Sequence, residues 1–327
     1  MRNFLTESGK IGAFFAIFAL MAAAVSAQPG SGGIKLRRAV DNDGDGKADY
    51  SVFRPSTNSW YILQSGGGFK YQQFGVASDD FMAPGDFDGD GKGDISVWRD
   101  STGVWYRLNS ATNTFTIIQF GISGDEPVGR DYDGDGKTDL AVIRRTGGAM
   151  IWYVLRSSDS NYQGGQFGLA SDYSAPGDYD GDGKFDLAVQ RPGATAASSA
   201  VFYIQRSSDN NLDVVQWGLS NDIVVPGDYD GDGKTDIAVV REGASPTDNL
   251  AWYIRRSSDG GLQGSFFGLT GTDLTTQNDY DGDGKTDLAV WRNSTGVFYY
   301  KRSIDGGETG VTWGSSGDFP IAGYDSH

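Results

Sequence analysis

The chain has 327 residues, no Cys and a single His at its last position, and its formal net charge is −16. The missing Cys excludes disulfides and thiolate metal sites, and with His327 alone we expect neither His-based catalysis nor a zinc centre. The strongly negative charge argues against nucleic acid and anionic membranes as partners.

The first 27 residues resemble a secretory signal peptide. Positive charges stand near the start, residues 11–24 are apolar, and Val25, Ser26 and Ala27 offer the small residues that signal peptidase needs. The apolar run is shorter than the ~20 residues of a membrane span, so we favour cleavage over a retained anchor. We expect a linker at 28–33 and a single domain at 34–327. The expected location is extracellular, at the cell surface or periplasmic, with no membrane insertion after cleavage.

One nine-residue pattern, Asp-x-Asp-Gly-Asp-Gly-Lys-x-Asp, occurs six times in the rest of the chain. The copies begin at Asp41, Asp86, Asp131, Asp178, Asp228 and Asp279, at spacings of 45, 45, 47, 50 and 51 residues. An Arg, an aromatic pair, a Ser and an aromatic-Gly step recur in register with it. Self-similarity at this period indicates a repeat architecture.

Each repeat predicts four strands and no helix. The first strand precedes the Asp loop, the second follows it, the third holds the aromatic pair and the fourth ends at the aromatic-Gly step. Runs such as 140–143 suit strands buried on both faces, and clusters such as 257–260 suit hairpin turns. We therefore predict an all-β fold, a β-propeller of six four-stranded blades. A seven-bladed or incompletely closed ring is the alternative.

The end of the chain bears on how such a ring would close. A solenoid would need distinct capping repeats, whereas Asp318–Tyr324 repeats the residues that lead into the Asp loop at Asp228 and then stops. This pattern is the one expected if Asp318–Tyr324 forms a last strand that completes the first blade. The segment Ile34–Val40 fits the same strand, and the sequence leaves the two alternatives open.

The chemistry of the Asp loop favours calcium, which takes six to eight oxygen ligands. Positions one, three, five and nine would supply Asp carboxylates, position seven would supply the Lys carbonyl, and the two Gly residues allow tight turning. We predict up to six structural Ca²⁺ ions, held by Asp41, Asp43, Asp45, Lys47, Asp49, Asp86, Asp88, Asp90, Lys92, Asp94, Asp131, Asp133, Asp135, Lys137, Asp139, Asp178, Asp180, Asp182, Lys184, Asp186, Asp228, Asp230, Asp232, Lys234, Asp236, Asp279, Asp281, Asp283, Lys285 and Asp287.

An EF-hand shares the first ligand positions but does not fit. Its twelfth position requires a bidentate Glu between two helices, and here strands flank the loop. The twelfth residue is always Val, at Val52, Val97, Val142, Val189, Val239 and Val290. Metal-free polar turns are the other alternative, which we disfavour because four clustered carboxylates would repel one another.

The repeats resemble the FG-GAP and VCBS family, found in integrin α-subunit propellers and in many secreted bacterial proteins. The resemblance rests on the Asp loop with its ninth-position Asp and on the steps at Phe74, Phe120, Phe167 and Phe267. It covers roughly residues 34–327 and implies a propeller with structural calcium. The family includes adhesion receptors, lectins and some polysaccharide lyases. Integrin-like propellers have seven blades, so no partner surface is carried over.

Three further positions recur in every copy, which favours architectural roles. We expect the aromatic pairs to pack between blades rather than to stack on sugars. We expect the repeated Arg to pair with a carboxylate of a neighbouring blade, and the repeated Ser to cap a hairpin turn through the backbone. The Arg residues are Arg54, Arg99, Arg144, Arg191, Arg241 and Arg292, and the Ser residues are Ser65, Ser110, Ser157, Ser207, Ser257 and Ser303.

Function is expected where the copies differ. The segments between the second and third strands vary in length, and strand alternation places them at the end of the blade opposite the Asp loop. We predict a binding patch from Arg145–Ile151, Pro192–Val201 and Glu242–Ala251, with neutral loop drift as the alternative.

The sequence thus predicts a secreted, monomeric, non-enzymatic binding or adhesion module for an extracellular glycan or protein. A polysaccharide lyase-like enzyme and a purely structural surface protein are the alternatives. No residue outside the repeats suggests catalysis, although a Lys or Tyr base leaves the lyase open.

Overall fold

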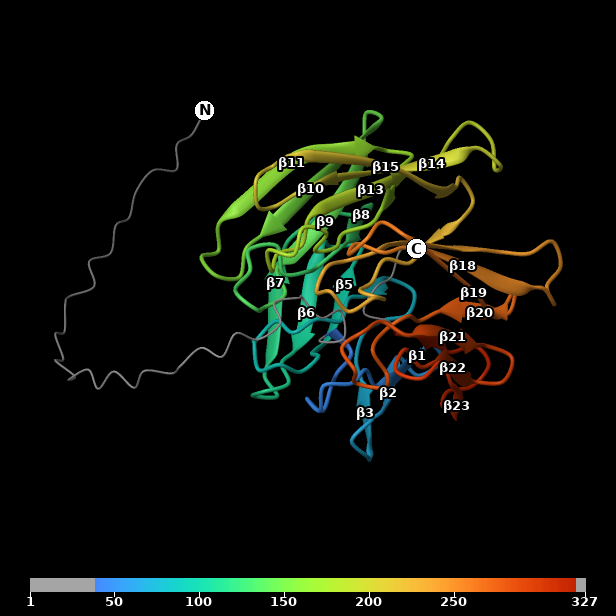
Figure 1. The fold of residues 1–327 in the computed structure, drawn as a ribbon. Helices are drawn as coiled ribbons and strands as arrows, with labels where there is room; N and C mark the ends of the chain where they lie inside the picture. The colour runs from blue at the N-terminus through green and yellow to red at the C-terminus, as the bar shows by residue number, and fades with distance from the viewer. Residues whose placement is uncertain (1–38, 322–327) are drawn as a thin grey trace, which may run out of the picture. The chain divides into compact units, whose positions relative to one another are not determined.

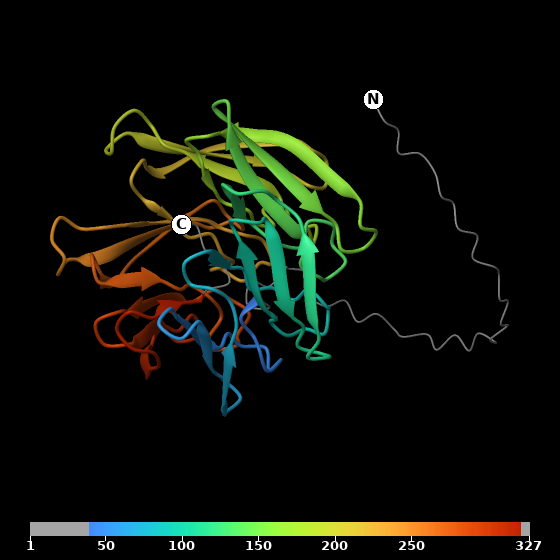
Figure 2. The same ribbon diagram turned by 180° about the vertical axis from the view of Figure 1, so that it is seen from behind.

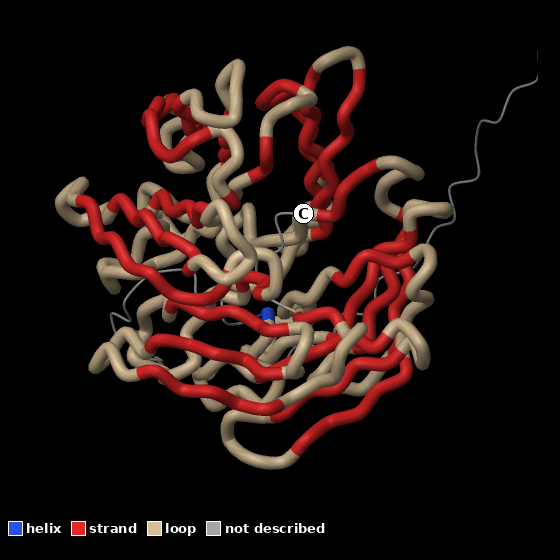
Figure 3. The backbone as a smooth tube through the Cα atoms, turned by 90° about the vertical axis from the view of Figure 1, so that its right-hand side faces the viewer, coloured by secondary structure: helices blue, strands red, loops and turns tan. Residues whose placement is uncertain are grey.

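The computed structural model describes residues 39–321. The predicted signal peptide at 1–27 and the predicted linker at 28–33 lie outside the described residues. Strands and loops make up almost all of the described chain (Figure 3). Within residues 39–321, no helix is long and apolar enough to cross a membrane.

Within residues 39–321, twenty-four strands form six four-stranded antiparallel sheets, which are the six blades of a β-propeller (Figure 1). Blade 1 holds β24 (Phe319–Pro320), β1 (Tyr50–Arg54), β2 (Ser59–Leu63) and β3 (Phe69–Gln73), and blade 2 holds β4 (Asp80–Met82), β5 (Ile95–Arg99), β6 (Val104–Leu108) and β7 (Phe115–Gln119). Blade 3 holds β8 (Asp125–Pro127), β9 (Leu140–Thr146), β10 (Ala149–Leu155) and β11 (Tyr162–Leu169), and blade 4 holds β12 (Tyr173–Ser174), β13 (Leu187–Arg191), β14 (Ser199–Gln205) and β15 (Leu212–Leu219). Blade 5 holds β16 (Ile223–Val224), β17 (Ile237–Arg241), β18 (Asn249–Arg255) and β19 (Leu262–Leu269), and blade 6 holds β20 (Asp273–Thr275), β21 (Leu288–Arg292), β22 (Val297–Lys301) and β23 (Glu308–Thr312).

The all-β prediction of six four-stranded blades is confirmed, and the seven-bladed alternative is not. Five of the sheets keep their four strands in chain order, whereas in blade 1 the last strand, β24, stands before β1. Blade 6 lies beside blade 1, as the red and blue segments show from behind (Figure 2). In blade 2 the second strand is mostly buried, the third buries its first two residues, and the fourth alternates between exposed and half-buried residues. The fourth strand is therefore the outer edge of each blade.

The ring closes through the C-terminal segment. Strand β24 pairs antiparallel with β1 and places Phe319 opposite Phe53, so it supplies the first strand of blade 1. Of the two sequence alternatives, Asp318–Tyr324 is the one that provides this strand, and its last three residues lie outside the described part. Only the last two residues of Ile34–Val40 are described, and neither belongs to a strand.

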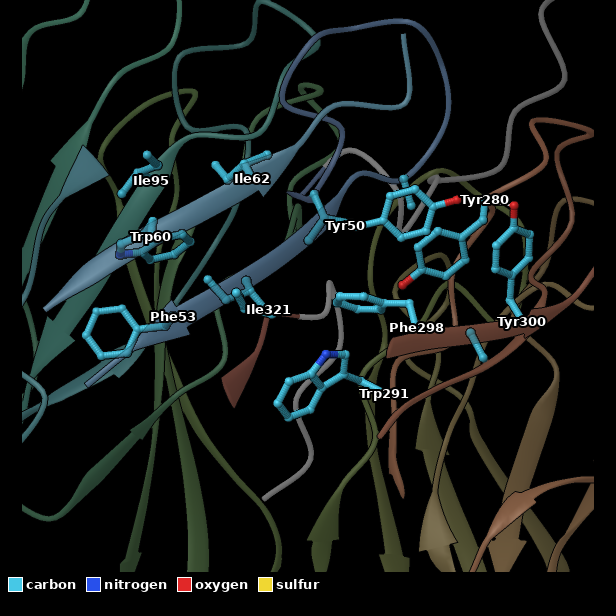
Figure 4. Close-up of a cluster of buried hydrophobic side chains, with 14 of the residues drawn as sticks. Tyr50, Phe53, Trp60, Ile62, Ile95, Tyr280, Trp291, Phe298, Tyr300 and Ile321 are labelled. Atoms are coloured by element: carbon cyan, nitrogen blue, oxygen red, sulfur yellow. Dashed lines mark hydrogen bonds between the residues drawn. The ribbon is translucent and has the colours of Figure 1, made fainter. Parts of the chain in front are cut away.

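The core lies between adjacent blades. The first aromatic of each pair is buried against the next blade, as Trp105 is against Leu140 and Val142. The second aromatic of blade 2, Tyr106, packs against the cluster of buried side chains that contains Trp60 of blade 1. At the closing seam, rings from blades 1 and 6 meet beside the last described residue (Figure 4). The prediction that the aromatic pairs pack between blades is therefore confirmed.

Two ends of each blade can be distinguished. The Asp loops join the first and second strands, and the turns between third and fourth strands lie at the same end, which we call the Asp-loop end. The turns between second and third strands lie at the other end, which we call the opposite end. These turns are residues 55–58, 100–103, 147–148, 192–198, 242–248 and 293–296.

Candidate metal centres

Each Asp loop is shaped by its own backbone amides, as the loop of blade 3 illustrates. The amides of Gly134 and Gly136 donate to the two carboxylate oxygens of Asp131, at 2.6 and 2.8 Å. Both glycines have φ above +80°, a left-handed conformation that a side chain would strain. The amide of Lys137 donates to Asp135 at 2.8 Å. The backbone of the loop therefore folds around the carboxylate of its first Asp.

The Asp side chains of one loop come close enough to share a cation. Carboxylate oxygens from three Asp residues lie within 4.8 Å of one another in six such groups among the described residues. Five of these groups are Asp41, Asp43 and Asp49; Asp86, Asp88 and Asp90; Asp131, Asp133 and Asp139; Asp178, Asp180 and Asp186; and Asp228, Asp230 and Asp236.

The hairpin between the third and fourth strands docks onto the Asp loop. In blade 3 the amide of Ser157 donates to Asp139 at 2.7 Å, and its hydroxyl donates to Asp135 at 2.8 Å. The other carboxylate oxygen of Asp139 accepts the amide of Tyr132. The repeated Ser therefore binds loop carboxylates, and the expectation that it caps its own turn was wrong. The same hydroxyl bond is made by Ser65, Ser110, Ser207, Ser257 and Ser303.

Burial makes these carboxylates costly to ionise without a cation. It raises the pKa of Asp139 and of Asp178 to about 7; repulsion from the other loop carboxylates adds to the rise, and backbone N–H bonds oppose it. The pKa is likewise raised, to about 6 or 7, at Asp49, Asp86, Asp186, Asp228, Asp236 and Asp287.

A hard cation fits this donor set. The loops offer carboxylate and backbone oxygens, and the described residues contain no Cys or His that would favour a softer metal. In the loops of blades 2–5, none of the Asp carboxylates forms an ion pair with Arg or Lys. The Asp clusters could therefore hold metal ions, whereas coordination by the position-seven carbonyl remains a prediction.

Successive loops are bonded to one another, which sequence reasoning missed. The amide at position eight donates to the carbonyl of the first Asp in the preceding blade, as Thr138 does to Asp86 at 2.7 Å. The equivalent bonds run from Gly93 to Asp41, Phe185 to Asp131, Thr235 to Asp178, Thr286 to Asp228, and Ala48 to Asp279, so they close a circle through all six blades. Because these bonds are between backbone atoms, only the invariant loop length could have hinted at them.

The Lys at position seven reaches across the same interface. A Cβ atom placed on Gly89 would lie 2.8 Å from Cε of Lys137, so the aliphatic stem of that Lys lies over the glycine of the preceding loop. The same contact joins Lys184 to Gly134 and Lys47 to Gly282. The fourth-position Gly therefore has a close side-chain neighbour in addition to its positive φ.

The repeated Arg is paired within its own blade, so the prediction of a partner in a neighbouring blade was wrong. Arg144 donates through two nitrogens to Asp125, at 2.7 and 2.8 Å, because β8 and β9 pair and place the two residues side by side. The guanidinium also lies over the ring of Tyr153, 4.7 Å from its centroid. A constant separation of 19 residues between Asp and Arg in blades 2–6 was the signal in the sequence.

The predicted binding patch is only partly made of loops. Residues Arg145–Ile151 are mostly strand, since β9 runs to Thr146 and β10 begins at Ala149. The extra residues there lengthen a hairpin. The segments Pro192–Val201 and Glu242–Ala251 do contain the seven-residue loops 192–198 and 242–248. The second of these borders an open cavity of about 460 Å³.

Comparisons with known proteins agree on repeats and fold. The sequence has no match among curated proteins. A family profile described as FG-GAP-like repeat matches residues 41–97 and 131–189, and each stretch contains two Asp loops. Among solved structures, the chain is similar to a mutant of AofleA from Arthrobotrys oligospora, with a TM-score of 0.50 and 9% identity over 87% of this chain and 90% of that one.

Two further solved structures are similar at lower scores. An oligogalacturonate lyase in complex with manganese has a TM-score of 0.47 and 12% identity over 79% of this chain and 74% of that one. A putative 6-phosphogluconolactonase from Bacteroides fragilis has a TM-score of 0.44 and 13% identity over 86% and 97% of the two chains. At these identities the likeness concerns the fold alone.

Proposed function

The chain carries FG-GAP-like repeats, and from this premise we propose that it is a secreted propeller with structural calcium that acts as a non-enzymatic binding or adhesion module. The observation that carries the calcium part is the gathering of Asp carboxylates within 4.8 Å in each group. Burial raises the pKa of these carboxyls, and a divalent cation would remove that penalty.

The donor chemistry supports calcium over other cations. Ca²⁺ accepts six to eight oxygen ligands in flexible geometry, whereas Mg²⁺ demands a small octahedron and retains waters. Each loop offers four Asp side chains and backbone carbonyls within nine residues. Because the hairpin between the third and fourth strands is bonded to the Asp loop, calcium held by that loop would stabilise two of the three strand connections of a blade.

The binding part of the proposal rests on the distribution of variation. The Asp loops, the Arg–Asp pairs and the aromatic pairs recur in the blades and belong to the architecture. The loops at 192–198 and 242–248 differ from the turns of the other blades. A rigid scaffold with variable loops at one end is a common design for binding proteins. We propose an extracellular glycan or protein as the ligand and a monomer as the working form.

The calcium proposal is tested by titrating calcium into chelator-treated protein in a calorimeter. We expect up to six ions per chain, with dissociation constants on the order of 10⁻⁴ to 10⁻³ M or tighter. Magnesium at the same concentration serves as the control and should bind more weakly. A chain that binds no calcium under these conditions would contradict the proposal.

The binding proposal is tested separately with arrays of glycans and matrix proteins, probed with and without chelator. We expect binding of at least one ligand class, without turnover, that weakens when calcium is removed. Release of unsaturated sugars from an acidic polysaccharide would instead identify a lyase. Absence of binding across both arrays would leave only a structural role.

A further inference from the structure

Blade 5 departs from the other blades on its fourth strand. Phe266 pairs with Ala251 of β18, and its ring is 70% exposed to solvent. The residues at the same register position in the other blades are Gln73, Gln119, Gln166, Gln216 and Thr312. In blade 2 the amide of Gln119 donates to the carbonyls of Thr102 and Gly103, so that residue ties the turn to the strand. A Phe cannot make these bonds, so Phe266 lacks the architectural contact that Gln119 makes in blade 2.

Phe266 lies at the wall of the open cavity of about 460 Å³, which we call the blade 5 cavity. The volume falls within the ~300–1,000 Å³ of small-ligand sites. Ala251 lies across the strands between Phe266 and Arg241. Four other blades have Val or Ile at the position of Ala251, so the small side chain leaves room beside the ring.

The loop that forms the other wall is held in place. The amide of Gly243 donates to the hydroxyl of Thr270 at 2.8 Å, and the amide of Thr270 donates to the carbonyl of Asp248 at 2.9 Å. The carboxylate of Asp248 also accepts the amide of Ser245 at 2.9 Å. A loop fixed at its base and within itself loses little conformational entropy on binding a ligand.

The same loop and the start of β18 carry the polar residues of the cavity. Glu242, Asp248 and Asn249 line it, and all three residues are exposed. Arg241 also borders the cavity, but its guanidinium is paired at 2.7 and 2.8 Å with Asp222 and lies over Tyr253. Two carboxylates, of which that of Asp248 is also bonded within the loop, and an amide therefore border the cavity without a free cation, which disfavours acidic ligands.

We propose that the blade 5 cavity binds a neutral pyranose unit of a glycan, with one C–H face of the sugar against Phe266 and hydroxyls bonded to Glu242, Asp248 and Asn249. Aromatic faces are negative and attract polarised C–H groups, and carboxylate and amide groups accept and donate hydrogen bonds to hydroxyls. This inference rests on the proposed binding function and narrows it to one site and one ligand class.

Blade 4 supplies a matched internal control. Its loop at 192–198 has the same length and the same anchor, with Gly193 donating to the hydroxyl of Ser220 at 2.7 Å. There Ser198 takes the place of Asp248, and Gln216 takes the place of Phe266. The propeller therefore accepts Gln at this position, and Phe266→Gln should fold.

The experiment measures binding of cellotriose, chitotriose and trigalacturonate to the calcium-loaded full chain by calorimetry and by saturation-transfer NMR. We expect cellotriose or chitotriose to bind and trigalacturonate not to bind. Phe266→Gln and Phe266→Thr should each weaken binding about tenfold or more, as should Asp248→Ser, whereas Gln216→Ala in blade 4 should leave it unchanged. Melting temperatures of all variants establish that they are folded.

Three outcomes overturn the inference. Binding that survives both Phe266 variants places the sugar elsewhere on the chain. Preference for trigalacturonate contradicts the electrostatic argument. Failure of both neutral sugars to bind removes the site, and the proposed binding function then stands only if the arrays yield another ligand, such as a matrix protein.

Discussion

The two ends of each blade bury Asp carboxylates and balance their charge in different ways. At the opposite end, the Asp of the first strand is paired with Arg from the second, as Asp125 is with Arg144 at 2.7 Å. At the Asp-loop end, the carboxylates of the Asp loops themselves form no ion pair with Arg or Lys in blades 2–5. A buried charge is tolerated only when it is paired. At the opposite end an Arg side chain therefore balances the buried charge. At the Asp-loop end we expect a metal ion from solution to do so.

The ends also differ in how strictly they repeat. Loops at the Asp-loop end are bonded amide to carbonyl around the ring, so one altered copy would disturb its neighbours. In the described part of the chain, no such circle of backbone bonds joins the turns of the opposite end, which range from the two residues 147–148 to the seven residues 242–248. The backbone bonds between Asp loops therefore restrict variation at the Asp-loop end, whereas the turns of the opposite end can vary in length.

Removing calcium is the strongest way to test this comparison. With dissociation constants of ~10⁻⁴ to 10⁻³ M and about 10 mM calcium, each site should add roughly 1.4 to 2.7 kcal/mol to stability. Summed over several sites, we expect a large fall in melting temperature in chelator, measured by calorimetry. Restoring calcium should restore the transition. A melting curve unaffected by chelator would mean that the Asp loops hold their shape without a cation.

At the opposite end, we expect stability to be lost when the Arg partner of a buried Asp is removed. Arg144→Ala leaves the buried carboxylate of Asp125 without its partner, and we expect a loss of about 3 kcal/mol that calcium does not repair. Arg156→Ala is the control, because Asp159 is exposed and the change in urea midpoint should be small. If the two variants lose the same stability, burial of the carboxylate does not determine the free energy that is lost with the Arg.

The calcium-free protein should have an unusual pH dependence. The pKa of Asp139 is raised by burial from 3.8 to about 7 in the folded state. A carboxyl with a raised folded pKa contributes stability at low pH, and this contribution is lost as the pH rises above 3.8 and through about 7. Without calcium, the urea midpoint should therefore be higher near pH 5 than near pH 8.

Calcium should reverse this trend, because the metal requires ionised carboxylates and protons compete with it. Asp139→Asn should reduce the pH dependence of the calcium-free protein, since the amide does not titrate. If the calcium-free protein is instead more stable near pH 8, the loop carboxylates are not the groups that control it.

The sequence predicted the blades well because each element occurs six times. A strand whose pattern is ambiguous in one repeat can be assigned from a repeat in which the pattern is clear. It could not decide how the ring closes, since Ile34–Val40 and Asp318–Tyr324 have the same strand pattern. That choice depends on pairing with β1, a contact between the two ends of the chain. Repetition thus predicts local structure but not the contact that occurs once.

Partners of the repeated side chains were harder to predict. Arg144 and Asp125 are 19 residues apart and meet only because β8 and β9 pair in one register. Ser157, in the turn between the third and fourth strands, bonds to Asp135 of the Asp loop over a separation of 22 residues. In both cases the residue type indicated a hydrogen-bonding role, whereas the partner followed from sheet geometry.

The smallest expected effect tests whether neighbouring Asp loops are mechanically linked. In blade 2, Gly89 and Gly91 have φ of +81° and +86°, so Ala at either position should cost about 1 kcal/mol of backbone strain. Only at Gly89 would the new Cβ meet a neighbour, Lys137 Cε at 2.8 Å, whereas nothing lies within 4 Å of it at Gly91. We therefore expect Gly89→Ala to be the more destabilising variant in chemical denaturation.

A double-mutant cycle assigns that difference to the interface between loops. Lys137→Ala removes the stem that a Cβ at position 89 would meet, and it should bring Gly89→Ala close to Gly91→Ala in stability. The same Lys137→Ala change should leave the effect of Gly91→Ala unaltered. If both glycine variants cost the same in either background, the Lys stem yields freely, and the linkage between loops rests on the backbone bond from Thr138 to Asp86 alone.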